Sequence, residues 1–266
     1  MRHLLLAALL ATTFSAQESQ WRATRHATLT SPDGWLTLVG LTWLHDGSNQ
    51  IELPAHPPVK RTFVLHNAQV SLDGKVLRDD TDPKGPTVEH IGSLSYEVIK
   101  RGDKNGDRFG IRMKDPKSHA RAHFLGLEYF PADAAYRVEA RFEPYDPPKK
   151  IAITNVLGMT SDETAPGALV FTLKGQTFRI DPILEQGEKD LFIIFKDKTS
   201  GHETYGAARY VYAPPPDASG KTVIDFNHAY NPPCAFTPYA TCPLPPPQNR
   251  LPIRIAAGEK KYAGGH

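Results

Sequence analysis

The chain has 266 residues, 40% of them apolar, which is enough to bury the core of one large β domain or two small ones. Its 31 Lys and Arg residues nearly balance its 29 Asp and Glu residues, and no basic stripe stands out, so the sequence predicts no nucleic-acid partner. The 24 prolines and 20 glycines are spread along the chain as turn residues, which favours many short strands over long helices.

The first 16 residues have the pattern of an export signal. Arg2 and His3 precede the apolar run Leu4–Ala11, and small residues follow around Ser15 and Ala16. We therefore expect residues 1–16 to be a cleaved signal peptide and the protein to be secreted or periplasmic. An uncleaved N-terminal core helix is the alternative. The run is too short to cross a bilayer and no second long apolar run follows, so the sequence predicts no membrane span.

A short helix is predicted over Gln17–Thr30, with Trp21, Thr24, Arg25 and Thr28 on one face and a stop at Ser31–Gly34. Beyond it, segments with strand character recur without helical periodicity. Trp35–Trp43 is apolar on both faces and predicts a strand buried on both sides. The other predicted strands are 63–65, 69–72, 75–77, 94–100, 108–113, 136–142, 151–157, 168–173, 177–183, 191–195 and 207–212.

Evenly spaced short strands indicate an all-β fold, antiparallel and sandwich-like or barrel-like. The polar link 115–125 separates two groups of strands, so we expect an N-terminal β lobe at 33–114 and a C-terminal β lobe at 120–266. Residues 213–252 carry eleven of the 24 prolines but also several aromatic residues. A disordered linker rarely keeps so many aromatics, so this stretch is predicted to be an ordered, Pro-rich cover on the second lobe.

Both cysteines of the chain, Cys234 and Cys242, lie in this cover. In an oxidising compartment they would form a disulfide, which stabilises by about 2–3 kcal/mol on the chain-entropy model. The alternative is a metal site, for which His228 is the nearest further ligand. Two cysteines without a close third ligand make a poor zinc signature, so no metal ligand is predicted.

Four stretches carry a resemblance to a known family. They are DGWLTLVGLTWLHDGSN (33–49), FKDKTSGHETYGAARY (195–210), DFNHAYNPPCAF (225–236) and CPLPPPQNRLPIRIAAGE (242–259). The chain resembles the bacterial and archaeal family DUF1684, a domain of unknown function. That resemblance implies no reaction, catalytic residue or cofactor. Residues 35–113 also resemble a forkhead-associated β-sandwich, but without its phosphothreonine-binding residues.

Polar residues of the last three stretches are candidates for a ligand site where DKTSGHETY meets DFNHAYNPPC. The candidate ligand-binding residues are Asp197, Ser200, His202, Glu203, Tyr205, Arg209, Asp225, Asn227, Tyr230, Asn231, Arg250 and Glu259. Such groups can bind a polar molecule, and we expect five of them, Asp197, His202, Arg209, Asp225 and Asn227, to converge in one pocket. The alternative is local turn bonding together with a partly buried salt-bridge network that fixes the cover.

The sequence therefore favours an exported protein that binds a small polar ligand, a saccharide or an organic anion. Whether it is also an enzyme is left open, as are any cofactor and the oligomeric state. One alternative is a non-catalytic interaction or structural module whose C-terminal motifs brace the fold. A weaker alternative is a metal-dependent hydrolase, or a hydrolase with Ser200 as nucleophile and His202 as base. Against it, the sequence has no Gly-x-Ser-x-Gly and no His-Glu-x-x-His.

Overall fold

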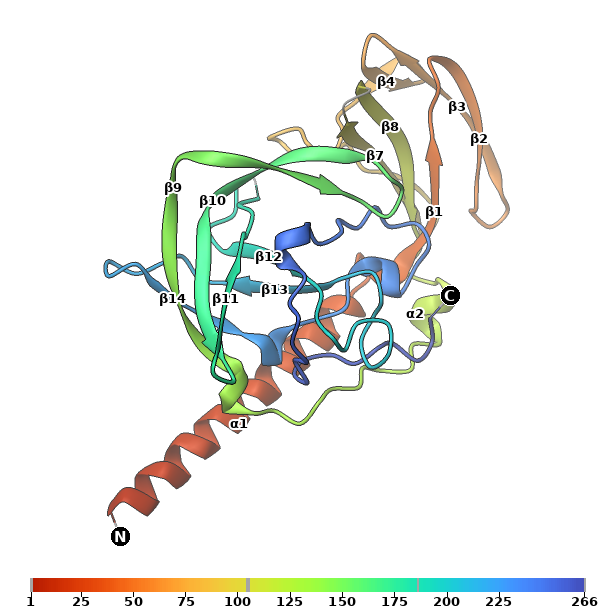
Figure 1. Cartoon of the computed structure of the whole chain (residues 1–266). Coiled ribbons are helices and arrows are strands. Elements are labelled where there is room, and N and C mark those ends of the chain that lie inside the picture. The colour runs from red at the N-terminus through yellow and green to blue at the C-terminus, as the bar shows by residue number, and fades with distance from the viewer. Residues whose placement is uncertain (1, 104–105, 186, 266) are drawn as a thin grey trace.

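The structure, a computed structural model, describes residues 2–103, 106–185 and 187–265. Two α-helices are described, α1 (Arg2–Leu29) and α2 (His119–Ala122). Short 3-10 helices are η1 (Trp35–Thr37), η2 (Ala134–Tyr136), η3 (Phe226–His228), η4 (Pro233–Ala235) and η5 (Pro247–Asn249). All other regular structure is antiparallel sheet, so the predicted all-β, sandwich-like class is confirmed (Figure 1).

The first group of strands forms two four-stranded sheets, ordered β1-β8-β7-β6 and β2-β3-β4-β5. Their bounds are β1 (Leu38–Trp43), β2 (Gly47–Leu53), β3 (Val59–His66), β4 (Gln69–Leu72), β5 (Lys75–Leu77), β6 (Glu89–Ile91), β7 (Leu94–Asp103) and β8 (Gly106–Lys114). Alternating side chains such as Phe63, Tyr96 and Ile111 meet in one apolar core between the sheets.

The second group forms a sheet ordered β11-β10-β9-β14 and the two-stranded sheet β12-β13. Their bounds are β9 (Arg137–Thr154), β10 (Thr160–Leu173), β11 (Gln176–Ile180), β12 (Leu191–Phe195), β13 (Arg209–Ala213) and β14 (Lys221–Asp225). Phe171, Phe195 and Phe226 lie in the core that these strands share. In Figure 1 the long strands β9 and β10 curve around this core, and their connected ends reach toward β7 of the first group.

Two tight hairpin turns are explained by the two residues at the centre of each turn. Asp73-Gly74 joins β4 to β5, and Lys174-Gly175 joins β10 to β11. All four residues have positive φ, between 50° and 78°, which is the backbone geometry of a two-residue turn that suits the twist of the strands. Both turns and the β7–β8 hairpin confirm the predictions at these positions.

Other strand predictions were wrong in detail. The strands β2, β6 and β14 were not predicted, and Trp35–Thr37 forms η1 instead of the start of a strand. The strand β1 is only partly buried, not buried on both faces. Residues 136–142 and 151–157 were predicted as two strands, but β9 runs through both regions. Its middle, around Pro144, is paired only with β10, because β14 pairs with residues 137–141. A proline without an N–H is tolerated on such an unpaired edge.

The helix α1 ends at Leu29, as predicted, but begins at Arg2. Glu18 and Leu29 are buried and Trp21 and Arg25 are half-buried, whereas Thr24 and Thr28 are exposed. The face of α1 that packs against the protein therefore differs from the predicted face. It includes Glu18 and Leu29, and it does not include the two threonines. The end of α1 near residue 2 lies away from the strands (Figure 1). No helix in the described ranges has both the length and the apolar character required to cross a bilayer.

The Pro-rich C-terminal segment is ordered, as predicted, and it does more than cover the lobe. Leu251, Ile253, Ile255 and Ala257 belong to the same core as Phe195. Just after β12, the Lys196 N–H donates to the Asn249 carbonyl and the Lys196 carbonyl accepts from the Leu251 N–H, so an irregular chain closes the lobe where no strand is available. The polar groups of this segment must therefore be satisfied inside the protein.

Candidate functional site

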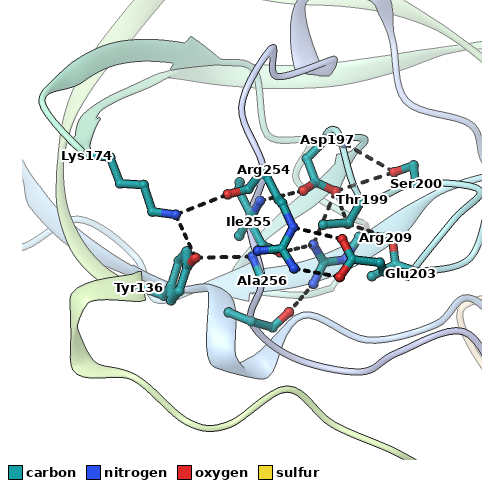
Figure 2. A network of polar contacts seen from close by, with 12 residues as sticks. Tyr136, Lys174, Asp197, Thr199, Ser200, Glu203, Arg209, Arg254, Ile255 and Ala256 are labelled. Carbon is teal, nitrogen blue, oxygen red and sulfur yellow. Dashed lines mark hydrogen bonds and ion pairs between the residues drawn. The ribbon is translucent and has the colours of Figure 1, made fainter.

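The first polar cluster joins the end of β12, the start of β13 and the C-terminal segment (Figure 2). Arg209 is buried, and its Nη1 donates to Asp197 Oδ1 at 3.3 Å and to the carbonyl of Ile255 at 3.0 Å. Its Nη2 donates to the carbonyl of Ala257. Asp197 also accepts from Thr199 Oγ1 at 2.6 Å and from the Ile255 N–H at 2.7 Å. These groups satisfy one another and fix the C-terminal segment.

In the loop that follows Asp197, Ser200 and His202 do not form the nucleophile and general base of a hydrolase. Ser200 Oγ bonds the Asp197 main chain and side chain, at 3.2 and 3.5 Å. His202 is exposed at the loop tip. Glu203 forms an exposed two-bond pair with Arg254, at 2.8 and 2.6 Å, and this pair lowers the pKa of the Glu203 carboxyl. The loop residues are therefore engaged in turn bonding and in tethering the C-terminal segment.

A second buried cluster ties α1 to the C-terminal segment. Arg25 Nε donates to Glu259 Oε1 at 2.7 Å, and Arg25 Nη2 donates to the carbonyl of Asn231 at 3.0 Å. Glu259 Oε2 accepts from the Asn231 N–H at 2.7 Å. The Arg25 guanidinium also lies over the Tyr230 ring, 4.6 Å from its centroid. Glu259 and Asn231 were predicted to bind a ligand. In the structure they bind Arg25 and so attach α1 to the C-terminal segment.

Asp225 and Asn227, two of the predicted ligand-binding residues, lie on different elements. The strand β14 ends at Asp225, and Asn227 lies in η3. Asp225 Oδ1 accepts from the Asn227 N–H at 3.0 Å, which is the cap that starts η3. The amide of Asn227 is buried and bonds the main chain of Asp133 at 2.9 and 3.0 Å.

Asp225 lines a pocket of about 340 Å³ together with His228, Trp21 and Asp190. Glu18 of α1 lies beside it, and Glu18 Oε1 is 2.9 Å from His228 Nε2. Burial raises the pKa of the Glu18 carboxyl, whereas the neighbouring His228 lowers it. The sequence analysis did not include Glu18, because a carboxylate on an N-terminal helix carries no signal of what it will contact.

A pocket with a volume of about 430 Å³ lies between the two groups of strands. Arg101 and Arg112 reach it from β7 and β8, and Arg25 reaches it from α1. Its aromatic lining residues are Trp35, Phe192, Tyr210, Tyr212, Tyr230 and Phe236. An apolar wall with a few converging charged groups is the usual composition of a small-molecule site.

The three arginines of this pocket are held in different ways. Arg101 Nη1 lies 2.8 Å from Asp80 Oδ2, and Arg101 Nε donates to Thr241 Oγ1 at 3.1 Å, which joins the two groups of strands. Arg112 is buried, and its Nη1 is 3.5 Å from Glu97 Oε1. Burial and the neighbouring Arg101 lower the pKa of the Arg112 guanidinium. Arg112 Nε is buried and has no hydrogen-bond partner among the described residues.

The two cysteines lie close together beside this pocket, and both are buried free thiols in this structure. The Cys234 N–H donates to Cys242 Sγ at 3.1 Å. Their mutual hydrogen bond lowers the pKa of the Cys234 thiol and, with burial, raises the pKa of the Cys242 thiol. The disulfide stays a prediction. Tyr205 donates to the Cys234 carbonyl at 2.9 Å and so has a local role.

The structure does not bring the five expected residues into one pocket. Asp197 and Arg209 form the first buried cluster, His202 is exposed, and only Asp225 lines a pocket. Tyr230 lines both pockets, and Arg250 is exposed. The arginines of β7 and β8 were missed, because such contacts cannot be read from the sequence: Arg101 and Thr241 are 140 residues apart and only the fold brings them together.

Two groups of antiparallel strands with an irregular, core-forming C-terminal segment define an all-β protein. Residues 122–260 match the family described as "Protein of unknown function (DUF1684)", and the chain belongs to this family. The match includes three of the four motif stretches, and 33–49 lies outside it. No curated protein matches the chain.

Among solved structures, the chain is similar to an uncharacterized protein of Haloarcula marismortui whose structure was determined in solution by NMR. The two are 32% identical, and the similarity covers 54% of this chain and 80% of that chain, with a TM-score of 0.46.

Proposed function

We propose that the protein binds a small organic anion in the 430 Å³ pocket between the two groups of strands. The observation that carries the proposal is the convergence of three arginines, Arg25, Arg101 and Arg112, on the lining of this pocket. Arg112 is also short of acceptors, because its buried Nε has no partner among the described residues, and such a donor costs about 1–3 kcal/mol. Carboxylate and phosphate oxygens are the usual acceptors for guanidinium groups.

The rest of the pocket supports an anion with an apolar portion. The guanidinium groups of Arg25 and Arg101 add positive charge, although Asp80 and Glu259 offset part of it. Tyr212 and Phe192 stack at 4.8 Å between ring centroids and offer an aromatic surface. Glu163 and Glu185 also line the pocket, so a ligand with hydroxyl groups would find acceptors there.

The test is thermal unfolding against organic acids, phosphorylated metabolites and uncharged sugars. A ligand that binds only the folded state adds about 2.7 kcal/mol at 100 times its dissociation constant. We expect an anion to raise the melting temperature, and Arg112→Gln to weaken that ligand at least tenfold. The matched control is Arg108→Gln, an exposed arginine of the same strand. Stabilisation by sugars alone would favour a saccharide as the ligand. An Arg112→Gln variant whose melting temperature the anion raises as much as that of the wild type would contradict the proposal.

A second candidate is a non-catalytic interaction or structural module whose C-terminal motifs brace the fold. The buried Asp197–Arg209 pair favours it, because its polar groups face the C-terminal segment and no pocket. On this proposal the first lobe binds a protein partner. It predicts that variants of Asp197 and Arg209 lose stability and that no small molecule of the panel raises the melting temperature of the wild type.

We also propose export with cleavage before Gln17. In support, the described side-chain contacts between α1 and the strands start at this position: Gln17 Oε1 is 3.4 Å from Arg137 Nη1, and Glu18, Arg22 and Arg25 follow. A mature chain that begins at Gln17 would keep all of these contacts. Intact mass measurement of the protein from the culture medium or periplasm tests the position. A full-length chain found only inside the cell would contradict it.

A further inference from the structure

Glu18, Asp225 and His228 form a three-residue cluster where α1 crosses the end of β14. Each offers one ligand atom, and these atoms all lie within 4.8 Å of one another. The bonds from Zn²⁺ to nitrogen and oxygen are about 2.0–2.2 Å long, so ligand atoms around one ion stand roughly 3–4 Å apart. Small side-chain adjustments would therefore bring the three atoms to a single cation.

Glu18 provides an independent sign of a bound partner. Its side chain is only 4% exposed, and its Oε1 contacts His228 Nε2. Its Oε2 is buried without a hydrogen-bond partner in the ranges that the structure describes. A buried carboxylate oxygen that loses its water and gains no donor is costly unless it is paired or coordinates a metal.

The other two ligands are held in place. Asp225 Oδ1 accepts from the N–H and the side-chain amide of Asn227, at 3.0 and 2.9 Å, while Oδ2 lies 4.0 Å from Arg137 Nε. The His228 ring stacks on Trp21, with centroids 4.6 Å apart and planes 4° from parallel. Hydrogen bonds to ligating carboxylates and fixed imidazole rings are the usual surroundings of protein metal sites.

We propose that Glu18, Asp225 and His228 bind a divalent first-row transition cation, of the class of Zn²⁺ and Mn²⁺. An imidazole in the set disfavours Ca²⁺ and Mg²⁺, which take oxygen ligands. Two carboxylates offset the charge of the ion. The 340 Å³ pocket adjoins the cluster and leaves room for water or a small ligand at the remaining coordination positions. This site is separate from the proposed anion site and does not depend on it.

The experiment is calorimetric titration of the full, chelator-treated chain with Mn²⁺, Zn²⁺ and Ca²⁺. We expect one Mn²⁺ or Zn²⁺ per chain and weaker Ca²⁺ binding. Glu18→Gln and Asp225→Asn should each lower the affinity by at least about tenfold. The matched control is Asp190→Asn, because Asp190 lines the same pocket outside the cluster. Equal affinity in all variants, or no binding by the wild type, would overturn the proposal.

Two further arms keep the result interpretable. The rings of His119 and His123 stack at 4.0 Å near the surface and are a competing adventitious site, so the titrations are repeated in the His119→Ala background. If a cluster variant fails to fold, NMR of the wild type still decides. Substoichiometric Mn²⁺ should broaden the Trp21 indole and His228 ring signals before others, and broadening elsewhere first would contradict the site.

Discussion

Arg209 and Asp197 are both buried, and the protein gives each of them several hydrogen bonds. Removing one partner of such a pair leaves the other charge buried without compensation, which usually costs about 3–5 kcal/mol. We therefore expect Asp197→Ala to lower the free energy of unfolding by that amount, as measured by urea denaturation.

The control for this prediction is the pair of Glu203 with Arg254, which links the same loop to the same segment but is exposed. Solvent and salt screen exposed pairs, so Arg254→Ala should change the unfolding free energy much less. An Asp197→Ala variant as stable as Arg254→Ala would show that the buried cluster does not brace the lobe.

Cys234 and Cys242 supply the second prediction at this scale. Because Cys242 Sγ already accepts from the Cys234 N–H, we expect the thiols to join in an oxidising compartment. The oxidised protein should then be about 2–3 kcal/mol more stable than the reduced protein. Thiol titration in denaturant without reductant measures the bond directly. Two titratable thiols in protein isolated from the periplasm would contradict it.

The sequence singled out several polar residues that are buried in the structure, but it did not predict the contacts that they make. Asp197, Arg209 and Glu259 were identified, but their partners are main-chain groups and Arg25. Those partners are brought together by loops without periodicity, so spacing along the chain carries no information about them. The carboxylate of Glu18 was missed for the same reason.

Among the elements, α1 is attached to the C-terminal segment through Arg25. Its guanidinium pairs with buried Glu259 and packs on the Tyr230 ring. We expect Arg25→Ala to lower the free energy of unfolding by roughly 3 kcal/mol, because Glu259 would be left buried without its partner. Limited proteolysis should then cut α1 faster. Thr24→Ala, on the exposed face of the same helix, is the control. Equal proteolysis of both variants would contradict the prediction.

The strands were predictable where a turn and an alternating pattern coincide. Lys174-Gly175 is the clearest example, since its turn fixes the register of β10 against β11. The course of β9 was not predictable. Pro144, Pro147 and Pro148 are typical of a break, but β9 tolerates them because β14 begins at Lys221, opposite Arg141, and leaves this edge of β9 unpaired.

At the scale of the whole molecule, the buried tyrosines predict how stability depends on alkaline pH. Burial raises the pKa of five tyrosines in or near the C-terminal lobe above the ordinary value of about 10. These residues are Tyr129, Tyr205, Tyr210, Tyr212 and Tyr230. Above about pH 10 the unfolded chain loses these protons while the folded protein keeps them. Stability is therefore fully present below that pH and falls as the pH rises.

The measurement is the urea midpoint from about pH 8 to about pH 11, together with tyrosinate absorbance. We expect the buried tyrosines to ionise only as the protein unfolds. Tyr210→Phe should reduce the slope of stability against pH, because it removes a buried tyrosine whose pKa is raised well above its usual value. Reversible ionisation of the buried tyrosines near pH 10 in folded protein would contradict the prediction.

The segment from Leu251 to Glu259 completes the core of the second lobe and receives the Arg25 side chain. These residues follow every strand that they seal, so the lobe cannot close before they have been synthesised. A chain that ends before Leu251 would expose apolar strands and would leave the guanidinium of Arg209 without its carbonyl partners. Closure of the second lobe is therefore a late step in folding, and the open intermediate exposes apolar surface that is prone to aggregation.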